Sequence, residues 1–292
     1  AVAIDGNYVL VGANQNKLEG LSTYYNGETY LFDATTGSLL HSFAPPESAD
    51  KFYDDYGYSV DIEGNLIAIG APEFRKFLSG GAIMDEHFRE APIAENIPVI
   101  LALLTIWNSN FLGSQSHAVL SYDSRLRTFV EFVQQLEMES NGKAVHADGS
   151  TCNVHTSPII WGGEETQGQH AFHQLLHQGT RTFSADFIAT VDPEHNHPDH
   201  HRWLLANCFS QSQVMLYGTA NQARDSTKVH EVVGGDHATT TILVDMLNAE
   251  ALGSLIALYE HKVACLGMIW RINSFDQWGV ESGKRLAREI YR

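Results

Sequence analysis

A twelve-residue pattern near the start of the chain occurs twice, 58 residues apart, at residues 2–13 and 60–71. Both copies place Gly-Asn between two short apolar runs, which is typical of a tight turn joining paired strands. A further strand pair is expected at residues 29–32 and 38–43, around a turn at residues 33–37. One such unit per ~50 residues is typical of propeller blades, each of which covers the apolar face of its neighbour. The repeat therefore predicts a small all-β unit.

The pattern changes near residues 73–75, without a linker composition at the join. Strands are then expected at residues 158–161, 187–191, 241–244 and 266–270. Helices are expected at residues 97–104, 126–133, 169–177, 203–217, 249–261 and 280–291, the first of them buried and the second capped by Asp123 or Ser124. Strands alternating with helices predict a mostly parallel sheet covered on both faces.

Composition narrows the classes of partner. A chain of 292 residues has room for about two domains, and its net charge of -17, without a basic cluster, argues against a nucleic acid partner. Three cysteines without a Cys-x-x-Cys pair favour a reducing compartment, and we expect a cytoplasmic protein. The longest apolar run, residues 97–107, is about half of a bilayer span, so no membrane partner is expected. No signal peptide opens the chain, although the pattern at Ala1 is compatible with a segment upstream.

The first segment with candidate chemistry is residues 134–143, where an apolar helix ends in an Asn-Gly turn. Gln135 and Glu139 are four residues apart and share one helical face. A carboxylate in this place could act as a general base. From spacing alone, a solvated helix end with a glycine stop signal is the more common explanation of this pattern.

The second segment is rich in histidine. His170, His173, Gln174 and His177 are expected on one polar helical stripe. His173 and His177 have the spacing of a zinc-protease helix, but Gln174 stands where that chemistry needs a glutamate, so no metal site is predicted. Residues 195–201 are interpreted as a solvated loop rather than a metal site.

The third segment is residues 275–284. Gln277 and Lys284 are seven residues apart, two turns along one helical face. Taken alone, a lysine in such a place is an ordinary exposed side chain.

Together these segments resemble the phosphoglucose isomerase family. The matching motifs, in chain order, are MDEHFREAP, MESNGK, GQHAF with HQGT, LIALYEHK and FDQWGVESGK, and the resemblance covers residues 74–292. Residues 1–73 resemble the FG-GAP repeats of β-propellers, with Tyr56-Gly57 in the Phe-Gly position and Gly70-Ala71-Pro72 as the second half. They amount to little more than one blade and lack the family's calcium loop of spaced aspartates.

The resemblance implies a fold and a division of the chain. The fold is an α/β sugar-isomerase (SIS) type three-layer α/β/α sandwich with a mostly parallel sheet, preceded by a small all-β propeller-like fragment at residues 1–73. Residues 74–115 would be a helical segment from the end of the first sugar-isomerase subdomain. Residues 116–292 would be the C-terminal sugar-isomerase subdomain.

The resemblance also implies an activity, the interconversion of glucose 6-phosphate and fructose 6-phosphate in glycolysis and gluconeogenesis, without metal or organic cofactor. Glu139 matches the base that moves a proton between C1 and C2 through a cis-enediol. His170 matches the histidine that helps to open the sugar ring and that comes from the neighbouring subunit, which implies a homodimer. Lys284 matches the lysine near the ring oxygen, and Gln135 and Gln277 match glutamines that hold the sugar and its phosphate.

Two elements of the family pattern are not found, a Ser/Thr-rich phosphate loop and an arginine that stabilises the enediolate. Such contacts supply several kcal/mol of transition-state stabilisation, so we expect impaired turnover near background. One alternative is an extracellular propeller-type binding or adhesion module fused to an inactive isomerase fragment. Another is an artificial join of two unrelated parts. The isomerase interpretation is preferred because its match covers about three-quarters of the chain and includes the reactive residues.

Overall fold

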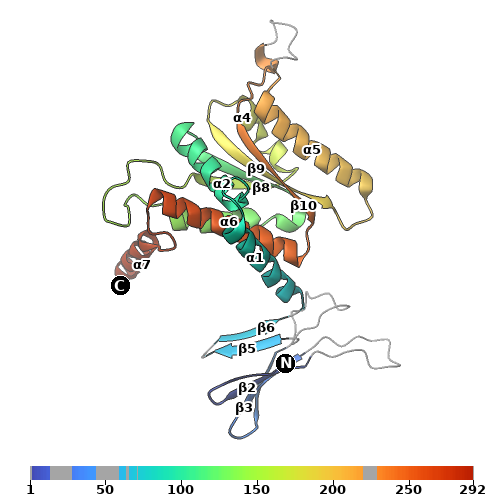
Figure 1. The fold of residues 1–292 in the computed structure, drawn as a ribbon, viewed down its shortest axis with the longest axis vertical. Helices are drawn as coiled ribbons and strands as arrows, with labels where there is room; N and C mark the ends of the chain where they lie inside the picture. The colour runs from blue at the N-terminus through green and yellow to red at the C-terminus, as the bar shows by residue number, and fades with distance from the viewer. Residues whose placement is uncertain are drawn as a thin grey trace.

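The computed structural model describes residues 2–13, 28–43, 59–63, 66–70, 72–219 and 229–291. Among these residues, strands and their turns precede Pro72, and an α/β unit follows it (Figure 1). The Tyr56-Gly57 pair, the second Gly-Asn turn and Ala71 lie outside the described residues. The division of the chain into domains stays a prediction.

The first strands form an antiparallel sheet in chain order. They are β1 (Val2–Asp5), β2 (Tyr8–Ala13), β3 (Glu28–Asp33) and β4 (Leu39–Phe43). A hairpin of β5 (Ser59–Glu63) and β6 (Leu66–Gly70) contacts β1 and β2 through β5. At the β3–β4 turn, Asp33 Oδ1 accepts the backbone N–H groups of Thr35 and Thr36, which closes an Asx turn. The predicted strand pairs are therefore confirmed.

This sheet buries little of its apolar surface. Among its described side chains Leu10 is fully buried, whereas Ile4 and Leu39 are 68% and 54% exposed. A sheet needs a second layer to bury an apolar face. Among the described residues, β5 of the β5–β6 pair lies against this sheet.

The α/β unit is built on four parallel strands in the order β10-β9-β7-β8. Their bounds are β7 (Ser116–Tyr122), β8 (Ile159–Glu164), β9 (Phe183–Asp192) and β10 (Ala238–Met246). The predicted parallel sheet is confirmed. We missed β7, because the polar residues His117 and Ser121 interrupt its apolar run although both are buried.

Helices cover both faces of this sheet (Figure 1). On one face Val119 and Ile188 pack against α2 (Ile97–Ile106), α3 (Phe129–Gln134) and α6 (Ala249–Trp270). On the other face Leu120 and Phe187 pack with residues of α4 (His173–Gln178) and α5 (Pro198–Tyr217). The remaining helices are α1 (Pro72–Glu90) and α7 (Trp278–Tyr291). The result is a three-layer α/β/α arrangement, consistent with the sugar-isomerase type.

Two glycines allow α1 to pack closely on α6. A Cβ at Gly80 would overlap the carbonyl oxygen of Glu250, and a Cβ at Gly253 would overlap that of Phe77. The Ser254 hydroxyl donates to the Gly80 carbonyl at 2.8 Å across the same crossing. Close backbone approach of this kind requires residues without a side chain.

Three secondary-structure expectations need correction. The strand predicted at residues 266–270 is the end of α6, because Leu266 and Trp270 are buried at helical spacing while Met268 is exposed. The helix predicted at residues 169–177 is interrupted: Gly168–His170 is a separate 3₁₀ turn. The helix predicted as buried at residues 97–104 exists as α2, but Leu103 and Leu104 are exposed.

By length and composition α6 could also cross a membrane. However, 56% of its most apolar window is buried inside the protein, where α6 covers the sheet.

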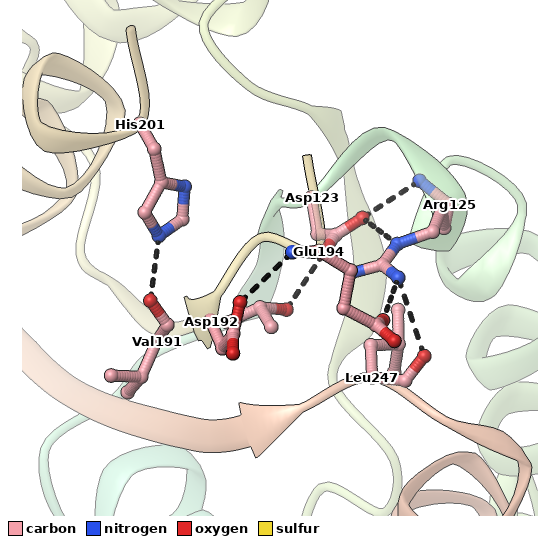
Figure 2. Close-up of polar contacts among 8 residues, drawn as sticks. Asp123, Arg125, Val191, Asp192, Glu194, His201 and Leu247 are labelled. Atoms are coloured by element: carbon pink, nitrogen blue, oxygen red, sulfur yellow. Dashed lines mark hydrogen bonds and ion pairs between the residues drawn. The ribbon is translucent and has the colours of Figure 1, made fainter. Parts of the chain in front are cut away.

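Figure 2 shows how the carboxyl ends of three strands are tied together. Arg125, after β7, donates from Nη1 to Glu194 Oε2 at 2.6 Å and to the Leu247 carbonyl at 3.4 Å. Its Nη2 donates to Asp123 Oδ2 at 2.8 Å. Ligands of open α/β sheets usually bind at the carboxyl edge, where the strand order reverses. In this chain the ion-paired Arg125 occupies that position between β7 and β9. Glu139, the predicted base, lies instead near the amino ends of the strands.

Candidate functional site

The segment with the predicted base is a π turn. The chain of α3 continues into η3 (Gln135–Glu139), a form of helix that is frequent at functional sites. Gln135 and Glu139 line a pocket of about 260 Å³. Its other lining residues are Phe132, Leu136, Ser140 and Phe275. The structure thus places the predicted base and one predicted substrate-binding glutamine in a single pocket.

A buried ion pair holds the same turn against α6. Glu137, between the two pocket residues, is 0% exposed, and its Oε2 lies 3.0 Å from Lys262 Nζ. Lys262 is 1% exposed. Because a buried charge without its partner is costly, this pair resists rotation of η3 about its axis. The pair therefore keeps Glu139 directed at the pocket.

Lys143 ties the end of η3 to a distant segment. Its Nζ donates to the carbonyl oxygens of Glu139 at 2.7 Å, Ser140 at 2.8 Å and Asp276 at 2.8 Å. The same ammonium lies 3.3 Å from Asp276 Oδ1. Lysine is favoured at a helix end because it neutralises the last carbonyls. Here it also fixes the segment that leads into α7 beside the base.

Asn141 makes a second connection between the same regions. Its Nδ2 donates to the Val263 carbonyl at 2.9 Å, and its Oδ1 accepts from the Ser274 hydroxyl at 2.5 Å. The side chain is fully buried. Asn141 of the MESNGK motif is therefore a buried junction between this helix end and α6, whereas Gly142 beside it is exposed.

The segment before α7 forms one wall of the pocket. Phe275 has φ 67°, which is unusual for an aromatic residue and is found where surrounding contacts impose it. The Gln277 carbonyl accepts the N–H groups of Val280 and Glu281, so Gln277 lies directly before the first residue of α7. Its side chain is exposed and lies outside the pocket lining.

Lys284 lies on α7 within electrostatic reach of Glu139. Its Nζ is 2.7 Å from Glu281 Oε1. The hydrogen bond to Glu281 and the charge of that carboxylate raise the pKa of Lys284, and the charge of Glu139 adds to this effect. The Lys284 side chain is exposed, and it is not among the residues that line the pocket of Glu139.

His170 does not meet the Glu139 of its own chain. It is exposed on the turn after β8, and the adjacent Gln169 Nε2 donates to Tyr122 Oη, at the end of β7, at 3.4 Å. By contrast η3 contacts the start of β8, where Met138 Sδ accepts from the Ile160 N–H at 3.3 Å. The length of β8 separates the two sites by roughly 15 Å or more, at about 3.3 Å per residue.

The other histidines of this region are structural. His173 is buried on α4, with Nε2 3.0 Å from Glu165 Oε1 and Nδ1 3.2 Å from Gln211 Oε1. His177 Nε2 shares that Gln211 oxygen at 2.6 Å, and burial lowers the pKa of His177. The expectation of one polar helical stripe is therefore wrong, since His170 lies on a separate turn and His173 points into the core.

No candidate metal centre is found in the part of the chain that the structure describes. No three His, Cys, Asp or Glu side chains come close enough there to hold an ion. In the histidine-rich stretch before and at the start of α5, His201 Nε2 bonds the Val191 carbonyl at 2.9 Å. That contact fixes α5 to β9 and is drawn in Figure 2.

Lys143 and Phe275 are among the residues of the site that had no predicted role. Lys143 stands four residues after Glu139 at a helix end, which is the spacing at which a lysine reaches the last carbonyls. That signal was available from the sequence. The role of Phe275 depends on a backbone conformation that no pattern indicated.

Comparison with known proteins assigns these features to a family. Residues 57–292 match the family model for phosphoglucose isomerase. The chain is 47% identical over 240 residues to the glucose-6-phosphate isomerase of Ectopseudomonas mendocina (strain ymp), and 48% identical over 239 residues to that of Stutzerimonas stutzeri (strain A1501). Each match covers 77% of this chain and 43% of the relative. The chain therefore spans less than half the length of these relatives.

Solved structures give a matching result. The crystal structure of a glucose-6-phosphate isomerase from Chlamydia trachomatis D/UW-3/Cx is similar at TM-score 0.69 and 38% identity, over 75% of this chain and 43% of that one. A hypothetical protein from Thermus thermophilus is similar at TM-score 0.55 and 23% identity, over 74% of this chain and 50% of that one. The second likeness shows the fold alone.

Proposed function

The chain belongs to the phosphoglucose isomerase family, and on that basis we propose that it carries the proton-transfer half of an isomerase of hexose 6-phosphates. The observation that carries the proposal is the pocket shared by Glu139 and Gln135, with Lys284 within electrostatic reach. The reaction would interconvert glucose 6-phosphate and fructose 6-phosphate, a step of glycolysis and gluconeogenesis. The similarity to relatives that are named glucose-6-phosphate isomerase supports this choice of substrate.

In this proposal Glu139 is the base that moves a proton between C1 and C2. One carboxylate on one face of the sugar can remove the proton and return it to the neighbouring carbon. Lys143 and the Glu137–Lys262 pair fix the turn that presents it. In the same proposal the charge of Lys284 would favour oxygen anions of the cis-enediol, and Gln135 and Gln277 would hold the sugar and its phosphate.

We propose that His170 acts in the site of a second copy of the chain. Its distance from its own Glu139, set by the length of β8, leaves it free for another pocket. A homodimer with twofold symmetry would give each Glu139 one His170 from the partner. The exposure of His170 fits this role.

The proposed activity is impaired in this chain. Among the residues that the structure describes, no arginine lines the pocket of Glu139. Losing one preorganised donor to a developing oxyanion costs about 10²–10³ in rate. Turnover near the background of a coupled assay is therefore expected. Turnover like that of the full-length Chlamydia trachomatis relative would contradict the impairment.

For the first strands we propose a blade-like fragment of the FG-GAP type. The four antiparallel strands follow one another in chain order, as in a propeller blade. The extracellular adhesion alternative gains no support from the relatives.

We propose that the protein is located in the cytoplasm, since Cys152, Cys208 and Cys265 are unpaired.

The proposed base is tested by proton exchange, which detects much slower chemistry than a coupled assay. Fructose 6-phosphate is incubated with the full chain in D₂O, and deuterium at C1 and C2 is followed by NMR. Slow exchange is expected, with a loss of about 10²-fold or more in Glu139→Gln. Glu131→Gln, an exposed carboxylate on α3, is the matched control. Exchange equal in wild type and Glu139→Gln would refute the role of Glu139.

The shared site is tested by mixing two variants. Glu139→Gln and His170→Ala chains, each deficient alone, are unfolded together and refolded. Heterodimers would contain one intact site, so about a quarter of wild-type exchange is expected from a 1:1 mixture. Absence of recovery, with heterodimers seen by native mass spectrometry, would refute donation across the interface.

A further inference from the structure

A second cavity, separate from the Glu139 pocket, lies between the amino ends of the parallel strands and α2. It has a volume of about 200 Å³ and shares no lining residue with the Glu139 pocket. Lining residues come from the starts of β7, β9 and β10, from α2 and the π turn η1 (Trp107–Phe111), and from α6. Sites for drug-sized ligands are commonly about 300–1,000 Å³, so any ligand here is small.

The charges at the base of this cavity are compensated within the protein. His117 Nε2 lies 3.0 Å from Asp186 Oδ2, which also accepts from Tyr259 Oη at 2.8 Å. Lys262 is paired with Glu137. Every positively charged lining residue is already paired, so none is available to bind a phosphate. An added anion would have no cationic partner and would be repelled by the buried Asp186 carboxylate. An anionic ligand is therefore disfavoured.

Uncharged hydrogen-bonding groups are left for a ligand. Among the residues that the structure describes, the side chains of Asn108 and Thr240 are available to the cavity without a hydrogen-bond partner of their own. Asn108 is only 8% exposed. Thr240 pairs in register with Asp186, so both side chains project from the same face of the sheet. An amide and a hydroxyl can each donate to and accept from a neutral ligand.

The opposite wall is apolar. It is made of Leu101, Leu104, Trp107 and Leu112, with the partly exposed indole of Trp107 among the residues nearest to solvent. Polyols and sugars match such a site, because their C–H faces are apolar and their edges carry hydroxyls. Aromatic side chains supply a large, rigid apolar surface for the C–H face.

We infer that this cavity binds a small uncharged polyhydroxy compound, a polyol or an unphosphorylated sugar. The hydroxyls of the ligand would bond Asn108 and Thr240, and its carbon face would lie on the Trp107 wall. The inference does not depend on the isomerase proposal, since it uses none of the residues of the Glu139 pocket.

The test is ligand-observed NMR titration of the full chain with D-glucose, with erythritol and with inorganic phosphate. We expect D-glucose and erythritol to bind and phosphate not to compete. Asn108→Leu and Thr240→Val keep the side-chain shape and each should weaken binding about tenfold, the effect of one lost hydrogen bond. Gln135→Ala, in the other pocket, should leave the affinity unchanged.

Several outcomes would overturn the inference. These are no detectable binding of either neutral compound, an affinity unaltered in both Asn108→Leu and Thr240→Val, or displacement of D-glucose by phosphate. Loss of binding in Gln135→Ala would assign the ligand to the Glu139 pocket instead. Circular dichroism of each variant shows whether the fold is retained. Because Asn108 and Thr240 lie on different elements, a folding defect in one variant leaves the other as an independent test.

Discussion

The N-terminal antiparallel sheet and the parallel-sheet unit use similar apolar strands with different results. In the parallel unit, helices cover both faces, and Leu120 and Phe187 are fully buried. In the antiparallel sheet, Leu39 and Ile4 face solvent although their strands are paired. Strand pairing satisfies the backbone in both, but only a second layer removes apolar side chains from water. In this chain, therefore, the pairing of strands does not by itself produce a hydrophobic core.

All five tryptophans lie in the parallel unit, at positions 107, 161, 203, 270 and 278. Urea unfolding followed by tryptophan fluorescence therefore reports on that unit and not on the antiparallel sheet. The same fluorescence signal therefore distinguishes substitutions that affect the parallel unit from those that affect only the antiparallel sheet.

The largest effect is expected from Lys262→Met. Because the change leaves Glu137 buried without its partner, it should lower the free energy of unfolding of the parallel unit by about 3–5 kcal/mol. The double variant Glu137→Leu/Lys262→Met should recover most of that loss. A cost below about 1 kcal/mol in the single variant would mean that water reaches the pair.

The next effect compares two leucines directly. Leu120→Ala, at a fully buried position, should cost about 2–5 kcal/mol in the urea titration. Leu39→Ala, in the antiparallel sheet, should change the same transition by less than about 0.5 kcal/mol. Equal costs would show that the two regions unfold as one cooperative body.

Acid should act on the parallel unit through Asp186. Burial alone would raise the pKa of this carboxyl, but the His117 and Lys262 charges and the bonds from His117 and Tyr259 hold it at about 2. Since this value lies below that of the unfolded chain, the stabilisation is complete above about pH 4 and is lost as pH falls toward 2. The loss should be about 2 kcal/mol in urea titrations between those pH values. Asp186→Asn should remove this dependence, and an unchanged slope would contradict the assignment.

The smallest expected effect is local. Lys143→Met removes three hydrogen bonds to carbonyls of two segments and should cost about 1 kcal/mol. Hydrogen exchange should quicken at residues 139–142 and 274–277 but not in β9. Lys284→Met is the matched control, because its only ion pair in the described structure is the exposed one with Glu281. Similar exchange in both variants would contradict the role of Lys143.

Much of the fold was predictable from pattern. Helix and strand positions such as α5, β9 and the first strand pairs follow from apolar periodicity and turn residues. The errors have physical reasons. A strand was predicted for the end of α6 because a fully apolar run has no visible period, and β7 was missed because His117 and Ser121 are buried polar residues.

The site was predictable in part. Gln135 and Glu139 share a pocket, as their spacing on one helical face indicated. The placement of His170 at the far end of β8 follows from the order of the strands, which no local spacing indicates. The roles assigned to these residues in the reaction stay predictions.

The sequence by itself determined the family, the parallel sheet between helices and the identity of the candidate base, because motifs and periodicity are local properties of the chain. Only the tertiary structure decided that Lys143 joins segments 133 residues apart, that Glu137 and Lys262 form a buried pair, and that a neutral cavity lies beside α2. These features depend on which distant residues meet, and burial then sets the strength of each charge and hydrogen bond.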